Sequence, residues 1–169
     1  MKKAVYCYCL VVLLSLAGCG YRPLYSSGSD DRGVVASLSS IAIQESDSRA
    51  GQLVRNSLLS SMRPAGTAQQ NLFKLILKPQ LTQSTLVEQS LPGIKRIRLR
   101  LTVSYQLIEA DSGSEINSGK TFSAVSYDVI REPVADLQAE SNATSRAAQE
   151  VASDIHTRLA AFMASRQNQ

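Results

Sequence analysis

The sequence IKRIRLRLTVSYQLI, residues 94–108, decides the fold because polar and apolar side chains alternate along its length. Successive side chains of a β-strand point to opposite faces, so this segment has one apolar and one polar face. The apolar face carries Ile97, Leu99, Leu101, Val103, Tyr105 and Leu107, and the polar face carries Arg96, Arg98, Arg100, Thr102, Ser104 and Gln106. This pattern predicts a long strand in a sheet that is covered on one side only.

A second alternating segment precedes this strand, at residues 71–88. Lys74 and Lys78 lie on its polar face, and Pro79 favours the edge of a sheet or a bulge. A turn at residues 91–93 separates the two strands, so we expect them to pair as a hairpin.

A third long strand follows at residues 115–130, after a turn at residues 111–113. Gly119 interrupts the alternation, and we expect a bulge there. A shorter alternating segment, residues 38–45, predicts the first strand of the domain.

Two segments space their apolar side chains by three and four residues, which predicts helices. The first runs from about Ser48 to Arg63 and ends before Pro64; the second runs from Pro133 to about Ser165. The predicted core stripe of the second helix is Leu137, Thr144, Ala147, Ala148, Val151, Ile155, Leu159 and Phe162.

The order strand, helix, strand, strand, strand, helix is typical of an α+β fold. We expect a four-stranded mixed sheet with the two helices packed on one face. Residues 38–165 then form a single domain. Residues 19–37 are rich in Gly, Ser, Asp and Tyr without periodicity, so they are predicted to form an extended tether.

The first 18 residues have the organisation of a secretory signal. Lys2 and Lys3 precede an apolar stretch that ends in Leu16-Ala17-Gly18-Cys19, a lipobox. We therefore predict that residues 1–18 are removed and that Cys19 becomes the lipidated first residue, carrying fatty acids such as palmitate. Gly20 after the cysteine favours sorting to the periplasmic side of the outer membrane over retention at the inner membrane.

Few residues suggest catalysis or a cofactor. His156 is the sole histidine and reads as a solvated helix residue; no serine lies in a Gly-x-Ser-x-Gly elbow, and no metal-ligand spacing occurs. The 18 basic and 14 acidic residues, two of the lysines in the leader, exclude a strong electrostatic footprint for nucleic acid. The sequence thus predicts a protein that is not an enzyme and needs neither cofactor nor metal.

The open polar face is the candidate binding surface. Arg96, Arg98 and Arg100 form a row with about 6.5–7 Å between neighbours. Lys74 and Lys78 of the preceding strand could join them in one cationic patch for phosphate groups. The charges alone favour a solvated face that prevents aggregation over a binding surface.

Three segments resemble the LPS-assembly lipoprotein family, LptE: Leu-Ala-Gly-Cys-Gly-Tyr-Arg-Pro-Leu-Tyr at 16–25, Gly-Lys-Thr-Phe-Ser-Ala-Val-Ser-Tyr-Asp at 119–128, and the helix at 145–159. The resemblance implies two helices on one face of a four-stranded sheet. It implies a lipoprotein that plugs and assembles the outer-membrane barrel LptD, binds lipopolysaccharide and helps its transport to and assembly at the outer leaflet. It also implies contact of basic sheet residues with lipid A, a role extended here to Arg96, Arg98, Arg100, Lys74 and Lys78.

Two other functions stay open. An auxiliary lipoprotein of a phospholipid-transport complex would share the anchor and an α+β domain but would partner an inner-membrane transporter. A periplasmic hydrolase would need a pocket that gathers His156 with a carboxylate and a serine.

Overall fold

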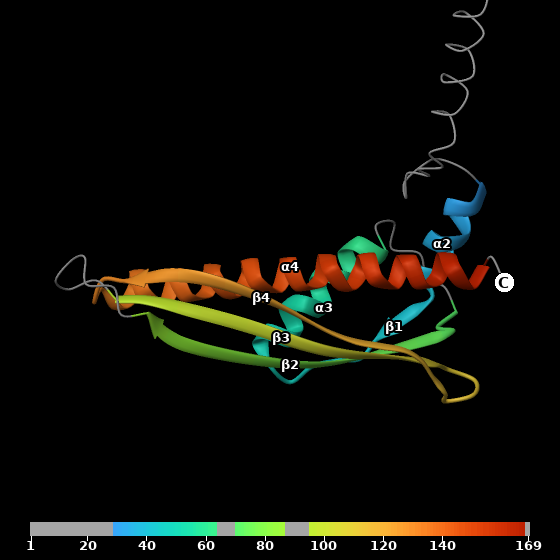
Figure 1. Cartoon of the computed structure of the whole chain (residues 1–169), viewed down its shortest axis with the longest axis horizontal. Helices are drawn as coiled ribbons and strands as arrows, with labels where there is room; N and C mark the ends of the chain where they lie inside the picture. The colour runs from blue at the N-terminus through green and yellow to red at the C-terminus, as the bar shows by residue number, and fades with distance from the viewer. Residues whose placement is uncertain (1–28, 64–69, 87–94, 168–169) are drawn as a thin grey trace, which may run out of the picture. The chain divides into compact units, whose positions relative to one another are not determined.

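The computed structural model describes residues 29–63, 70–86 and 95–167, and the chain divides into two units, residues 1–32 and 33–169. The sheet and the helices that pack on it belong to the second unit (Figure 1). The elements are α2 (Ser29–Ser39), β1 (Ile41–Ile43), α3 (Arg49–Met62), β2 (Phe73–Leu86), β3 (Lys95–Glu109), β4 (Glu115–Val129) and α4 (Pro133–Gln167).

The sheet has the strand order β1-β2-β3-β4. β1 runs parallel to β2, whereas β2–β3 and β3–β4 are antiparallel, so the sheet is mixed. α3 packs on α4 and against β2, and α4 packs along β4 and β3 (Figure 1). The predicted α+β class, mixed sheet and strand–helix order are confirmed.

The core lies between the sheet and the two helices. Leu99, Leu101 and Leu107 of β3 are fully buried there, as are Ile155 and Leu159 of α4. Burying each such side chain stabilises the fold by about 1.5–3 kcal/mol. The alanines at 143, 147, 148 and 152 are also buried, so the backbone of α4 lies close to the sheet.

Local signals explain where the helices begin and end. The Ser48 hydroxyl accepts a hydrogen bond from the Gly51 amide at 3.1 Å and caps the N-terminus of α3. The Arg63 amide donates to the Leu59 carbonyl at 2.9 Å, one residue before Pro64. α4 begins with Pro133, whose missing amide hydrogen costs nothing in the first turn.

Three expectations about the helices and strands were wrong. Residues 29–37 are not extended, because α2 runs to Ser39 and leaves only Ile41–Ile43 for the first strand. The register shift on β4 falls opposite Leu107 and Ile108 rather than at Gly119. Leu137 is 69% exposed, because it lies in the first turns of α4, before the buried positions that begin at Ala143.

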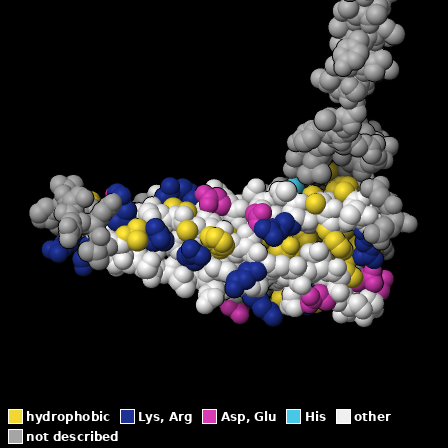
Figure 2. Space-filling model, viewed as in Figure 1, with side chains coloured by type: hydrophobic (Ala, Val, Ile, Leu, Met, Phe, Trp, Pro, Cys, Tyr) yellow, Lys and Arg dark blue, Asp and Glu magenta, His cyan; other side chains and the backbone are white. Residues whose placement is uncertain are grey.

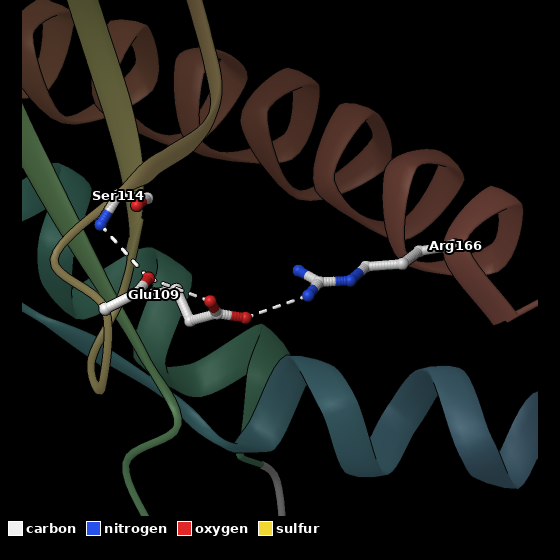
Figure 3. Close-up of polar contacts among 4 residues, drawn as sticks. Glu109, Ser114 and Arg166 are labelled. Carbon is white, nitrogen blue, oxygen red and sulfur yellow. Dashed lines mark hydrogen bonds and ion pairs between the residues drawn. The ribbon is translucent and has the colours of Figure 1, made fainter.

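The last turn of α4 is joined to the end of β3 by an ion pair (Figure 3). Arg166 Nη2 lies 2.8 Å from Glu109 Oε1, and the guanidinium carbon lies 5.6 Å from the centre of the Phe73 ring. The Glu109 amide also donates to the Ser114 carbonyl at 3.0 Å, which closes the β3–β4 turn. Hydrogen bonds from Arg166 and then Ser112 hold the pKa of Glu109 below its usual value.

Candidate functional site

The face of the sheet opposite α3 and α4 is built from the even-numbered residues of β2, β3 and β4. The register sets Ser84, Arg98 and Ser126 side by side in one row, and Thr82, Arg100 and Ala124 in the next. The Arg98 and Arg100 side chains are exposed, whereas the neighbouring odd-numbered residues Leu99 and Leu101 are buried. The predicted arginine row therefore lies on the uncovered face.

Arg96 differs from the other two arginines of the row. Its Nε lies 2.8 Å from Asp128 Oδ1 and its Nη2 lies 3.2 Å from Oδ2, a two-pronged contact across the β3–β4 pair. The hydrogen bond from Arg96 holds the pKa of Asp128 below its usual value, so the carboxylate stays charged and neutralises the arginine. Arg98 forms no ion pair with any described residue.

Phe122 was not predicted as a site residue. It is 58% exposed on the open face of β4, and the guanidinium carbon of Arg100 lies 4.5 Å from the centre of its ring. Cation–π attraction of this kind is worth about 0.5–1 kcal/mol at an exposed site. Alternation along β4 could have identified Phe122 as a site residue, because it is an aromatic residue among the even-numbered, solvent-facing positions of the strand. A cation stacked on an exposed aromatic ring suits a ligand with both charge and apolar surface.

The lysines form a second group instead of one patch with the arginines. Lys78 and Lys120 flank Ser104 in one row, four residues along β3 from Arg100. Four residues of a strand span about 13 Å. Lys74 lies opposite Ile108, four residues farther away. In the view of Figure 2, Lys and Arg side chains are spread along the length of the molecule, with hydrophobic and acidic side chains between them.

The helix side offers little that resembles a catalytic centre. His156 is half-buried, not solvated as expected, and burial lowers its pKa. Within residues 29–63, 70–86 and 95–167, no three His, Cys, Asp or Glu side chains gather as metal ligands. None of the helices in these ranges is long and apolar enough to cross a membrane. The lipobox, Cys19 and the tether up to residue 28 lie outside the described residues.

The domain is thus an α+β sheet with helices on one face and a cationic, aromatic-bearing surface on the other. The chain belongs to the LptE family, described as lipopolysaccharide-assembly, whose model matches residues 37–159. The resemblance noted in the sequence is confirmed, and the chain belongs among lipopolysaccharide-assembly proteins.

Solved structures similar to the chain include two lipoproteins. A provisionally assigned lipoprotein from Caulobacter crescentus CB15 is 28% identical, with a TM-score of 0.68, over 79% of this chain and 97% of that one. A minor lipoprotein from Acinetobacter baumannii has the same fold at 17% identity, with a TM-score of 0.56 over 72% and 89% of the two chains. No curated protein sequence matches the chain.

Proposed function

We propose that this protein is an outer-membrane lipoprotein that plugs and assembles the LptD barrel and binds lipopolysaccharide on its open sheet face. The observation that carries the binding role is the exposed pair Arg98 and Arg100 on the open face, with Arg100 stacked on the exposed ring of Phe122. Guanidinium groups bind phosphate through paired hydrogen bonds, and an exposed ring offers apolar surface to acyl chains.

The two cationic groups suit an amphiphile with more than one phosphate. Arg98 and Arg100 hold one phosphate of lipid A in this proposal, and Lys78 with Lys120 holds another about 13 Å along the strand. Arg96 and Lys74 contribute longer-range attraction, since Arg96 shares its charge with Asp128. Cys19 carries the fatty acids that confine the domain to the membrane. The proposal involves no covalent step on the ligand.

Charge reversal tests the binding role directly. Arg98→Glu with Arg100→Glu should weaken binding of purified lipopolysaccharide at least about tenfold, because two charge-assisted contacts become repulsive. The matched control is Arg131→Glu with Arg146→Glu, which makes the same charge change at exposed positions off the open face. If both double variants lose the same affinity for lipopolysaccharide, or if the first loses none, the open face is not the binding site.

Co-purification tests the partner. The full-length lipoprotein extracted from the native envelope should bring with it a large outer-membrane barrel. Recovery of an inner-membrane transporter complex instead would favour the phospholipid-transport function. Mass spectrometry of the mature N-terminus should show a Cys19 residue that carries fatty acids.

A further inference from the structure

The outer edge of β4 is a second candidate interaction surface, separate from the open face. β4 is the last strand of the sheet and pairs only with β3 among the described strands. An edge strand presents unpaired amide and carbonyl groups, and their natural complement is another extended chain.

Hydrogen bonds at the β3–β4 turn establish which residues face outward. The Glu109 amide donates to Ser114 on the β4 side, whereas the Ala110 amide donates to Leu72 on the β2 side. Odd-numbered residues of β3 therefore point their amides toward β4, where the register pairs them with odd-numbered residues from Asn117 to Val129. The even-numbered residues of β4 must then turn their amides and carbonyls outward: Lys120, Phe122, Ala124, Ser126 and Asp128.

The two edges of the sheet differ in how well they are protected from pairing with an added strand. β1 pairs with Phe73–Leu75, and the Gln44 amide donates to the outward carbonyl of Leu75, so the start of β2 is covered. Pro79 follows in the same outward register and has no amide hydrogen to offer. β4 contains no proline. Of the two edges, β4 is the one able to accept a long added strand.

A cleft of about 490 Å³ runs between this edge and α4. Ser126 and Tyr127 line it from β4, and Asn142, Ser145 and Arg146 line it from α4. An extended chain paired with Phe122, Ala124 and Ser126 would place every second side chain on the α4 side. Arg146 is exposed and forms no ion pair with any described residue, so an acidic side chain there would gain a partner.

We propose that an extended segment of a partner protein adds to the edge of β4 as a fifth strand, with an acidic side chain directed at Arg146. Backbone hydrogen bonds to Phe122, Ala124 and Ser126 hold the segment, and the cleft beside α4 selects its side chains. This inference does not depend on the identity of any lipid bound at the open face.

Amide exchange and edge variants test the proposal in the full-length lipoprotein. Exchange across residues 120–128 is measured by mass spectrometry in the protein alone and in the complex extracted from native membranes. About half of these amides should exchange at least about tenfold more slowly in the complex, because outward amides gain hydrogen-bond partners.

Ala124→Pro removes one outward amide and leaves the β3 pairing intact, so partner retention should fall by about tenfold, the worth of one backbone hydrogen bond. Ala124→Thr keeps the amide and serves as the matched control. Arg146→Glu should reduce retention of the partner without altering β4. This variant tests the proposal even if the proline variant fails to fold.

Three results would overturn the proposal. Exchange across residues 120–128 could be the same in the complex and in the protein alone. The wild-type protein could be extracted as a single chain with a fast-exchanging edge. Protection could also coincide with a doubled mass from two identical chains, which would make a second copy the occupant.

Discussion

A Cβ atom at Gly119 would lie 2.6 Å from the hydroxyl oxygen of Tyr105, its partner across the β3–β4 pair. The Tyr105 ring occupies the space that a side chain at position 119 would need, and it is only 4% exposed. The glycine is therefore required by its neighbour's ring and not by a bulge. An aromatic ring lying over a glycine on the adjacent strand stabilises such a site.

Substituting Gly119 should destabilise the domain. Gly119→Ala is expected to cost about 1–3 kcal/mol, because a buried ring must move to admit the new methyl group. Thermal or urea unfolding measures the change. The double variant Gly119→Ala with Tyr105→Leu should cost less than the sum of the two single changes, because the smaller side chain removes the clash. Additive costs would show that the ring does not set the requirement.

Alanine substitutions of single side chains in α4 should affect the free energy of unfolding differently at buried and at exposed positions. Ile155→Ala should cost about 2–5 kcal/mol, because Ile155 is fully buried and its loss leaves a cavity. Leu137→Ala should change the free energy of unfolding by less than about 0.5 kcal/mol, because Leu137 is exposed. Equal costs in urea unfolding would mean that the start of α4 is packed in solution.

The Arg166–Glu109 pair should contribute to stability in a pH-dependent way. The folded-state pKa of Glu109 is lowered, so its contribution is present above the pKa of the unfolded chain, about 4.3, and is lost as pH falls through the folded value. The stability difference between wild type and Glu109→Gln should therefore shrink as the pH is reduced below about 5. A difference that stays constant down to acid pH would exclude the ionised carboxylate as its source.

Phe122 should matter for ligand binding and not for folding. Phe122→Ser removes an exposed ring, so the unfolding midpoint should hardly change, whereas lipopolysaccharide affinity should fall by about five- to tenfold with the lost apolar contact. Phe122→Leu keeps apolar surface and should bind better than the serine variant. Calorimetric titration with purified lipopolysaccharide provides the comparison, and equal affinity of all three proteins would remove the ring from the site.

Periodicity made most of the fold predictable. The alternation in residues 95–109 follows from burial of one face of β3, and the spacing in α3 and α4 follows from burial of one helix stripe. The arginine row could be predicted from the two-residue repeat of a strand alone. Periodicity reports which side of a strand or helix is covered, so it also showed that the row faces away from the core.

The amino-acid sequence by itself determined the strand and helix order from β1 to α4, the uncovered cationic face and the family. Tertiary structure alone decided that Arg96 is neutralised by Asp128, that Phe122 stacks under Arg100, and that Lys78 joins Lys120 and not the arginines. It also decided that β4 is an edge strand among the described strands. The reason is that alternation specifies a side chain's face, whereas its neighbours depend on strand register, which is set by contacts between residues far apart in the chain.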